Sequence, residues 1–387
     1  MKSLRTALRN RASFRLALLS RHLSSESKMF STSPSAEEDV IMEKLANGAA
    51  RITLNRPKAL NALNLSMVKK IYPNLKQWDA DPTVRIILIK GAGDKAFCAG
   101  GDVRAVADGK KIHHNSIPEE FFKEEYRLNY TIGTLKTPYV ALIDGITMGG
   151  GVGLSVHGPY RVATERTVFA MPETGIGLFP DVGGGYFLPR LSGKLGIYLA
   201  LTGVRLKGRD VQLAGVATHY VASDKVLDVE TALLNSSGKN VGDILDRFHQ
   251  ECLRPENQSF SLQPFMEQIN DCFSASTIEG IFKSLENDGS DWAKSQLKAL
   301  KKMSPTSMKV TLRQLQLGAK MSLKEDLEME YRMSQQCMEG HDFFEGIRAV
   351  LVDRDQQPRW SPPHISDVSD SDVERFFQSL GSKDLHL

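Results

Sequence analysis

The stretch ITMGGGVGLS, residues 146–155, places three consecutive glycines and a fourth, Gly153, within an apolar run. Glycine repeated between a strand-like and a helix-like segment indicates that the backbone must approach something closely. Three kinds of neighbour would need such a turn: a phosphate group, a packed helix or a reacting carbonyl oxygen. The residues around the turn distinguish between these.

Both nucleotide-binding interpretations fit the glycine stretch poorly. A phosphate-binding loop requires Lys and Ser or Thr after its glycines, whereas Val152 and Gly153 follow Gly151 here. The dinucleotide fingerprint G-x-G-x-x-G is matched at Gly149 and Gly151, but Leu154 occupies its third glycine position. The stretch therefore favours close packing or carbonyl binding over nucleotide binding.

A second glycine turn, KAFCAGGDVRAV at residues 95–106, also lies between a strand-like and a helix-like segment. Two such turns at helix starts can each present an unpaired backbone N–H group at a common point. Two donors that converge on one carbonyl oxygen form an oxyanion hole. The other interpretation, in which both turns only allow tight packing, stays open from these residues alone.

The segments around these turns predict an α/β domain. RITLNRP at 51–57, VRIILIKG at 84–91 and PYVALIDG at 138–145 are apolar on both faces, as buried strands are. Apolar residues at every third or fourth position predict an amphipathic helix over 64–82. This alternation of strand and helix continues to about residue 220.

Helical patterns dominate after the polar segment NSSGKNVG at 235–242. Ser304 followed by Pro305 predicts one helix start, and Ser322 with Glu325 predicts a capping box at another. The final stretch, which begins with SPPHISD, is acidic and contains proline, so we expect a surface tail or strap there.

The N-terminus is strongly basic, although the net charge of the whole chain is only +3. The cations that precede the first acid, Glu26, are Lys2, Arg5, Arg9, Arg11, Arg15 and Arg21. Apolar residues between them are spaced as in an amphipathic helix, which is typical of a mitochondrial transit peptide. A basic arm that binds nucleic acid or a membrane is the alternative. We expect a near-neutral mature chain in the mitochondrial matrix.

The predicted organisation has three parts: a transit peptide at 1–28, an α/β core at 36–234, and a helical C-terminal region with a tail at 235–387. No apolar stretch reaches the roughly 18–20 residues that a membrane span requires. The four cysteines are widely separated, which argues against a disulfide framework and a zinc site. We therefore expect reduced thiols and no metal.

Four spaced motifs resemble the crotonase superfamily of enoyl-CoA hydratases and isomerases: NRPKALNAL at 55–63, FCAGGD at 97–102, GITMGGGVG at 145–153 and MPETGIGLFPDVGG at 171–184. Within that superfamily they are most similar to the branch that hydrolyses 3-hydroxyisobutyryl-CoA in valine breakdown, and GHDFFEGIRAVLVDRDQQPRW at 340–360 extends the similarity. The resemblance implies a crotonase-like spiral of ββα units with a helical C-terminal region. It also implies an acyl-CoA substrate, with 3-hydroxypropionyl-CoA as a further one, and no separate cofactor.

The resemblance assigns roles to five residues. Gly101 and Gly150 would supply the two N–H groups of the oxyanion hole that holds the thioester oxygen. Glu173 matches the superfamily's catalytic glutamate, and it would act as general base or attack directly to give a mixed anhydride. Asp181 would bind the 3-hydroxyl group of the substrate, and Glu125 would help to hold this polar end.

Gly153 departs from the hydratase pattern. In the hydratase an acidic residue stands at this position, two residues after the glycine triplet, and acts on the water that adds to the double bond. Hydration relies on a pair of carboxylates, so the glycine favours hydrolysis over hydratase or isomerase activity. A structural subunit of a mitochondrial assembly such as the ribosome is a further alternative, although the near-neutral mature chain lacks a basic footprint for RNA.

Lys58, Ala59 and Leu60 lie in the loop that lines the CoA tunnel in the superfamily. Lys58 would meet a phosphate of CoA, although an exposed lysine is often merely solvated. His113 and His114 lie in a polar segment, and neither His157 nor His219 shows a pattern typical of a catalytic triad. We expect an acyl-CoA as the small-molecule partner, without DNA or membrane, and leave self-association and a mitochondrial assembly open.

Overall fold

Residues 38–113, 117–236, 238–254 and 259–387 are described by the computed structural model of the protein, and contacts group residues 39–387 into a single unit. The predicted transit peptide at 1–28 lies outside the described residues. The predicted boundary near residue 235 falls within the single unit, at the segment between helices α9 and α10.

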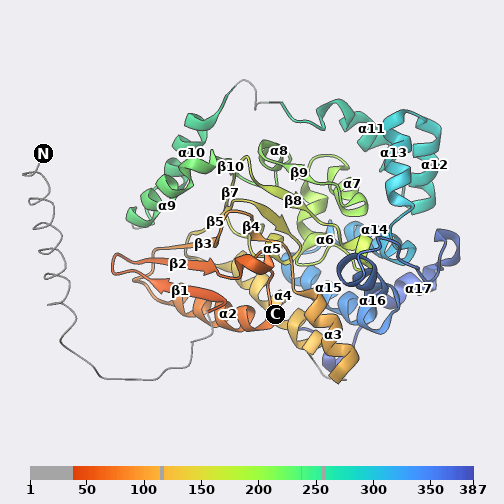
Figure 1. Cartoon of the computed structure of the whole chain (residues 1–387), viewed down its shortest axis with the longest axis horizontal. Coiled ribbons are helices and arrows are strands. Elements are labelled where there is room, and N and C mark those ends of the chain that lie inside the picture. Colours follow the sequence, from red (N-terminus) through yellow and green to blue (C-terminus); the bar gives the residue numbers. More distant parts are fainter. Residues whose placement is uncertain (1–37, 114–116, 237, 255–258) are drawn as a thin grey trace, which may run out of the picture. The chain divides into compact units, whose positions relative to one another are not determined.

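Residues 40–220 contain two sheets (Figure 1). The larger contains, in spatial order, β1 (Val40–Lys44), β2 (Ala49–Leu54), β3 (Ile86–Gly91), β5 (Tyr139–Ile143), β7 (Tyr160–Ala163) and β10 (His219–Tyr220). The smaller contains β4 (Ala96–Cys98), β6 (Ile146–Met148), β8 (Val168–Ala170) and β9 (Leu206–Lys207). Neighbouring strands are parallel except in the pairs β1–β2 and β8–β9. The predicted α/β class is thereby confirmed.

Helices surround the sheets and make up most of the C-terminal half (Figure 1). They are α2 (Leu65–Ala80), α3 (Val103–His113), α4 (Ile117–Thr134), α5 (Gly150–Gly153), α6 (Gly184–Phe187), α7 (Leu195–Thr202), α8 (Arg209–Leu213), α9 (Val226–Asn235), α10 (Val241–Cys252), α11 (Met266–Cys272), α12 (Ile278–Asp288), α13 (Asp291–Leu300), α14 (Pro305–Gly318), α15 (Leu323–Glu339), α16 (Asp342–Ile347) and α17 (Asp370–Glu374). Among the helices described, none combines the length and the apolar character that crossing a bilayer requires.

The buried strands and the first long helix are where the sequence predicts them. All of β5 and the first four residues of β3 are buried, because both faces of the larger sheet are covered. The helix predicted over 64–82 is α2, whose N-cap Asn64 accepts a hydrogen bond from the Met67 N–H at 2.8 Å. Pro73 lies within α2 but is exposed, on the side away from the core.

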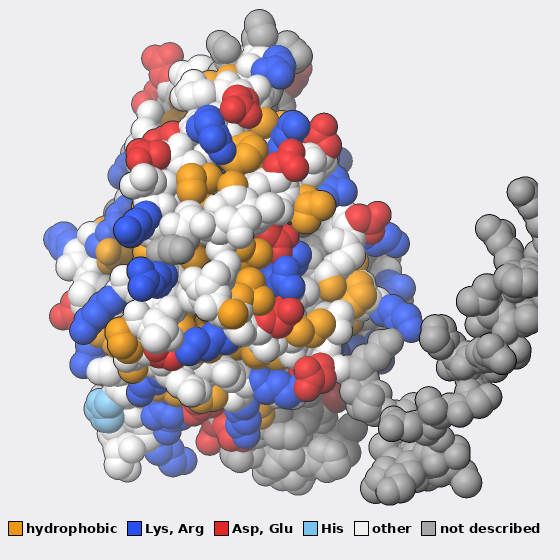
Figure 2. All heavy atoms as spheres, turned by 90° about the vertical axis from the view of Figure 1, so that its left-hand side faces the viewer, with side chains coloured by type: hydrophobic (Ala, Val, Ile, Leu, Met, Phe, Trp, Pro, Cys, Tyr) orange, Lys and Arg blue, Asp and Glu red, His pale blue; other side chains and the backbone are white. Residues whose placement is uncertain are grey.

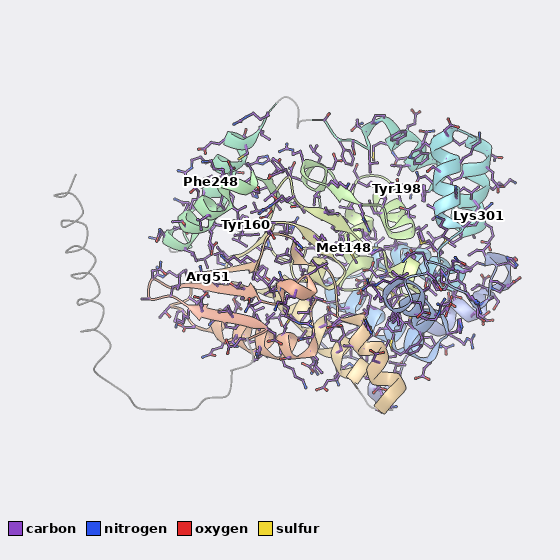
Figure 3. The ribbon with its side chains drawn as sticks, viewed as in Figure 1. Arg51, Met148, Tyr160, Tyr198, Phe248 and Lys301 are labelled. Atoms are coloured by element: carbon purple, nitrogen blue, oxygen red, sulfur yellow. The ribbon has the colours of Figure 1, made fainter. Side chains whose placement is uncertain are left out.

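The register of the smaller sheet brings three loops together. β6 pairs in parallel with β4 on one side and with β8 on the other. Cys98 is paired with Thr147, and Met148, near the centre of the molecule in Figure 3, is paired with Ala170. Since parallel strands end at the same edge, the segments after these strands meet there, as in other open α/β sheets where ligands bind at the carboxyl ends.

The C-terminal helices pack against this edge. α14 and α15 both contact α6, and α15 also contacts α4. The predicted caps are confirmed: the Ser304 side chain accepts from the Ser307 N–H, and Ser322 forms a capping box with Glu325. The segment predicted as a tail or strap is anchored, because Val368 and Leu385 within it are buried.

Candidate active site

A cavity of about 660 Å³ opens where β4, β6 and β8 end. Its lining includes the five residues predicted to act on the acyl end of the substrate: Gly101, Gly150, Glu173, Asp181 and Glu125. They come from the two glycine turns, from α4, and from the segment that follows β8. The fold therefore gathers into one cavity residues that are up to 80 positions apart in the sequence.

The two glycine turns bring two backbone N–H groups close together. A Cβ atom built on Gly150 would lie 3.1 Å from the amide nitrogen of Gly101. Gly150 is the first residue of α5, where a helix leaves its amides unpaired. Among the described residues, neither the Gly101 N–H nor the Gly150 N–H, at the start of α5, has a backbone acceptor. This arrangement can hold a carbonyl oxygen between two donors.

The segment after β2 holds the first glycine turn in place. The Leu63 N–H donates to the Gly100 carbonyl at 2.8 Å, and the Asp102 N–H donates to the Leu63 carbonyl at 2.8 Å. In this parallel bridge the intervening N–H, that of Gly101, points to the other side. The Arg56 guanidinium adds an ion pair to Asp102 at 3.0 Å.

The left-handed residues Leu60 and Asn61 shape this supporting segment, with φ of 52° and 55°. Asn61 is fully buried and tolerates this conformation because its short side chain bonds locally. It accepts from the Arg56 N–H at 2.9 Å and donates to the carbonyls of Ala92 and Ala96 at 2.9 and 2.8 Å. The NRPKALNAL motif at 55–63 thus stabilises the glycine turn that contains Gly101.

Three buried carboxyl groups line the same cavity. Glu125 lies on α4, Glu173 begins the 3-10 turn η2 (Glu173–Ile176), and Asp181 follows that turn. Each of the three residues is at most 5% exposed, and Oε1 of Glu125 and Oε2 of Glu173 have no partner among the described residues. The Tyr126 hydroxyl donates to Oδ2 of Asp181 at 3.0 Å. The carboxyls are therefore held in the cavity with oxygens available to a ligand.

Burial controls the protonation of this cluster. It raises the pKa of Glu125 and of Glu173 well above their ordinary range, and the charge of Asp181 adds to the increase in both. Burial also raises the pKa of Asp181 to about 7, while the Tyr126 hydroxyl lowers it. Since like charges this close oppose one another, the three groups share protons at neutral pH instead of all being ionised.

Gly153 faces a space that is already filled. A Cβ atom built there would lie 2.7 Å from the Asn129 side-chain nitrogen and 2.7 Å from Cβ of Val182. Real Cβ atoms do not approach other atoms so closely, so this position has no room for a longer acidic side chain. The second hydratase carboxylate is thus excluded by volume as well as by sequence.

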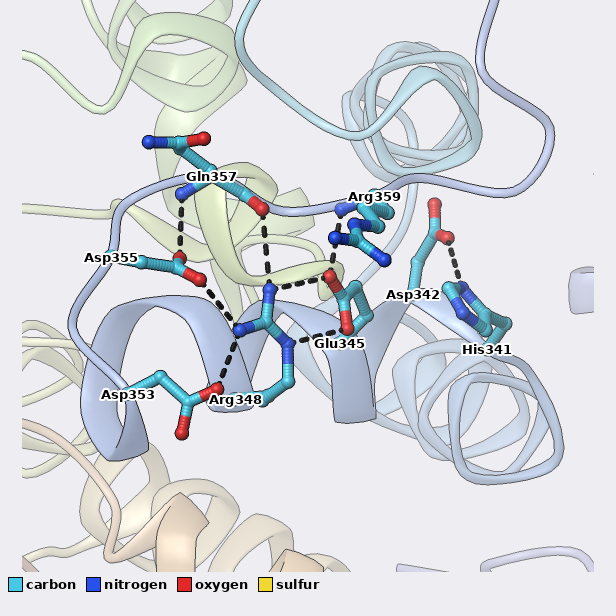
Figure 4. A network of polar contacts seen from close by, with 8 residues as sticks. All are labelled: His341, Asp342, Glu345, Arg348, Asp353, Asp355, Gln357 and Arg359. Carbon is cyan, nitrogen blue, oxygen red and sulfur yellow. Dashed lines mark hydrogen bonds and ion pairs between the residues drawn. The ribbon is translucent and has the colours of Figure 1, made fainter.

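A C-terminal segment forms another wall of the cavity, through Val350, Leu351 and Gln356. It comprises the π-helix η7 (Arg348–Val352) and the turn after it. The Arg348 guanidinium lies at the centre of a polar network (Figure 4), with acceptors on Glu345 at 2.8 and 2.9 Å, Asp353 at 2.6 Å, Asp355 at 2.7 Å and the Gln357 carbonyl at 3.2 Å. This network folds the segment back over the cavity.

The residues predicted to contact CoA lie beside the cavity and not in its lining. Lys58 and Ala59 belong to the 3-10 turn η1 (Pro57–Ala59), both are exposed, and Leu60 caps this turn. Ala62, two residues further on, does line the cavity. The CoA contact of these three residues stays a prediction.

The histidines form no triad among the described residues. His219 lies between Asp246, at 3.2 Å from Nε2, and Thr218, at 2.8 Å from Nδ1. The Thr218 hydroxyl donates to the Arg161 carbonyl, so it serves the backbone and is not a free nucleophile. His114 lies outside the described residues.

Tyr126 and Glu330 were not predicted from the sequence, and His157 was given no role there, although its Nε2 lies 2.7 Å from the Val182 carbonyl oxygen. Tyr126 follows Glu125 directly, and its contact to Asp181 spans 55 positions. Glu330 is fully buried on α15, on the same face as Leu327 and Ser334. An acid within the apolar stripe of an amphipathic helix was the available signal for Glu330.

Comparisons with known proteins place this geometry in a family. A family model described as enoyl-CoA hydratase/isomerase matches residues 49–377. A curated relative from Gallus gallus named 3-hydroxyisobutyryl-CoA hydrolase, mitochondrial, is 58% identical and aligns over 90% of this chain and 91% of its own length. The relative of the same name from Homo sapiens is 57% identical, with 90% and 91% covered.

Solved structures show the same fold. A carnitinyl-CoA dehydratase from Mycobacterium thermoresistibile superposes with a TM-score of 0.83 at 38% identity and covers 90% of this chain and 98% of its own. An enoyl-CoA hydratase from Rhodobacter sphaeroides has a TM-score of 0.83 at 36% identity, with 90% and 100% covered. The fold predicted from the motifs is therefore confirmed.

The substitution Gly153→Ala should destabilise the protein by about 1–3 kcal/mol, because the added methyl group collides with Val182 and Asn129. Urea unfolding measures this difference. Gly242→Ala in α10 is the matched control: its Cβ has room, and alanine is the better helix former, so stability should stay equal or rise. Equal stability of wild type and Gly153→Ala would contradict the packing described.

Glu125→Gln should raise the free energy of unfolding at pH 8 by at least about 1 kcal/mol. The folded pKa of Glu125 is raised, so the folded state holds the proton more tightly and stability falls as pH rises through that pKa. Glutamine has no such proton, so the gain should shrink toward pH 5. Denaturant unfolding at both pH values measures it, and a gain independent of pH would argue against a strained carboxyl cluster.

Proposed function

The chain belongs to the enoyl-CoA hydratase/isomerase family, and on that premise we propose that it hydrolyses the thioester of 3-hydroxyisobutyryl-CoA in mitochondria. The observation that carries the proposal is the meeting, in one cavity, of three buried carboxyls and two N–H groups that find no backbone acceptor in the described part of the chain. Relatives at 57–58% identity bear the name of that hydrolase. The basic segment at 1–28 would direct the chain to the mitochondrion.

The two glycine amides would polarise the thioester. The N–H groups of Gly101 and Gly150 would donate to its carbonyl oxygen, on which negative charge develops when the carbonyl carbon is attacked. A donor of this kind lowers the barrier by about 3–4 kcal/mol in other acyl-transfer enzymes. A Cβ atom on Gly150 would lie 2.6 Å from Oε1 of Glu125, so glycine is needed for this approach.

Glu173 would supply the attack. Its Oε1 would lie 3.0 Å from a Cβ atom built on Gly149, the residue before the oxyanion donor Gly150, so the carboxyl lies beside the position of the carbonyl. As a base, ionised Glu173 takes a proton from water while the water oxygen bonds to the carbonyl carbon and the CoA thiolate leaves. As a nucleophile, it bonds to that carbon itself, the thiolate leaves, and water then hydrolyses the anhydride. A thiolate is a good leaving group near neutral pH in either route.

Asp181 and Glu125 would recognise the 3-hydroxyl group. The Tyr126 hydroxyl occupies Oδ2 of Asp181, which leaves Oδ1 for the substrate. Because the pKa of Asp181 is raised to about 7, this carboxyl can accept from the hydroxyl when ionised and donate to it when protonated. The unpartnered Oε1 of Glu125 offers a second contact to the same polar end.

The two alternative functions find less support. The solved structures at 36–38% identity are a hydratase and a dehydratase by name, but this chain has no room at Gly153 for the second acid of hydration. For a structural role in a ribosome-like assembly, one would look for a basic surface. On the face shown in Figure 2, acidic and basic side chains are interspersed. CoA arrives as part of the substrate, so we propose no cofactor.

Glu173→Gln should lower kcat for 3-hydroxyisobutyryl-CoA by about 10²–10⁴-fold, because the amide neither accepts a proton nor attacks the carbonyl. Release of free CoA, followed with a thiol reagent, measures this. Glu267→Gln, at an exposed position on α11, is the control and should keep full activity. Near-normal turnover by Glu173→Gln would remove Glu173 from the chemistry, and wild-type hydration of crotonyl-CoA would restore the hydratase alternative.

Asp181→Ala should reduce the preference for 3-hydroxyisobutyryl-CoA over isobutyryl-CoA by about 10–100-fold, since a hydrogen bond to a charged group is lost. The ratio of kcat/KM for the two substrates measures this preference, and general damage to the site cancels in the ratio. An unchanged ratio would show that Asp181 does not recognise the hydroxyl.

A further inference from the structure

The segment 180–185, which carries Asp181, is held by residues outside the cavity. Two of its carbonyls accept hydrogen bonds: Pro180 from Nε2 of Gln314 at 2.8 Å, and Val182 from Nε2 of His157 at 2.7 Å. Two of its N–H groups donate to Glu330: Gly183 to Oε2 at 2.7 Å, and Gly185 to Oε1 at 3.0 Å. Four fixed contacts on six residues constrain the turn strongly.

The turn itself has an unfavourable backbone. Val182 has a φ of 54°, and a β-branched residue in this left-handed region is a genuine outlier. Its side chain is fully buried in the space next to Gly153. Such a conformation persists only where the surroundings hold it, and it is found most often at functional sites.

Glu330 makes the two contacts that directly follow this outlier in the chain, to the N–H groups of Gly183 and Gly185. It is fully buried on α15, and both of its carboxylate oxygens accept backbone N–H groups, with a third bond from Nε2 of Gln314 at 2.8 Å. Among the described residues no Lys or Arg pairs with it. A buried acid without a cation is costly. Each oxygen of Glu330 accepts a different N–H group, and in glutamine one of these two positions becomes an NH₂ group, which donates and cannot accept.

We propose that Glu330 is a positioning residue that sets substrate selectivity: by holding the amides of Gly183 and Gly185, it keeps Val182 left-handed and Asp181 directed into the cavity beside Tyr126. This inference rests on the proposed role of Asp181 in binding the 3-hydroxyl group. Glu330 does not line the cavity, so it acts on the substrate only through the turn. Through Glu330, helix α15 thereby contributes to recognition without lining the cavity itself.

The test is a double-mutant cycle on substrate preference. The measured quantity is the ratio of kcat/KM for 3-hydroxyisobutyryl-CoA to that for isobutyryl-CoA, in Glu330→Gln, in Asp181→Ala and in the double variant. We expect Glu330→Gln to lower the ratio by about 10–100-fold, as misplacement of a binding group does. Since Glu330 acts through Asp181, adding Glu330→Gln to Asp181→Ala should change the ratio no further.

Ser334→Ala provides the control for general disturbance of α15. Ser334 is fully buried one turn after Glu330 on the same helix, and its hydroxyl donates to the Tyr331 carbonyl at 2.8 Å. Its hydrogen bonds among the described residues stay within α15, so alanine should leave the ratio unchanged. A ratio that falls equally in Ser334→Ala would indicate general disturbance of α15 and overturn the inference.

The remaining outcomes separate the two proposals. If Asp181→Ala lowers the ratio and a folded Glu330→Gln does not, the inference is wrong and the proposed function stands. If Asp181→Ala leaves the ratio unchanged, the recognition role of Asp181 fails first. Should Glu330→Gln not fold, Gln314→Met removes the bonds to Pro180 and Glu330 at similar volume; a lowered ratio then supports the inference, and an unchanged ratio overturns it.

Discussion

The parallel pairing of β6 with β4 and β8 is the constraint on which the site depends. It forces the chain to leave three neighbouring strands at one edge, and each exit has to turn into a helical segment at once. Two of these exits are glycine turns because another backbone lies against them: Gly151 faces the Cys98 carbonyl, where a Cβ atom would approach to 2.3 Å. The same closeness that excludes side chains leaves amides facing the cavity.

A second feature that shapes the site is a group of five buried carboxyl groups. Glu125, Glu173 and Asp181 face the cavity, and Asp326 and Glu330 lie behind it, each at most 5% exposed. Burial raises the pKa of every one of them. Such a set opposes folding at neutral pH, and the extensive apolar core around it compensates. Protons shared in this way leave both donors and acceptors available for a hydroxylated acyl group.

Much of the fold could be predicted from the sequence, whereas contacts between residues far apart in the chain could not. The buried strands, the helix over 64–82 and the caps at Ser304 and Ser322 follow from local patterns. The residues alone left open whether the two glycine turns converge, and the pairing of β4 with β6 brings them together. The roles of Glu173 and Asp181 came from motif resemblance and stay predictions. Tyr126 and Glu330 were missed because their partners lie 55 and about 147 positions away, beyond the range of any local pattern. The volume at Gly153 likewise depends on Val182, which only the folded chain brings near.

The clamp on the 180–185 turn has a consequence for how the protein is made. Synthesis proceeds from the N-terminus, and the two sheets are complete once β10 has been translated. Glu330 and Gln314 emerge about a hundred residues later, so a nascent chain can pair its strands before the contacts of these two residues to the segment 180–185 exist. The hydrogen bonds of the segment 180–185 can therefore be completed only when most of the polypeptide has been synthesised. Products truncated before α14 would contain the glycine turns of Gly101 and Gly150 without the contacts by which, on our proposal, Asp181 is directed into the cavity.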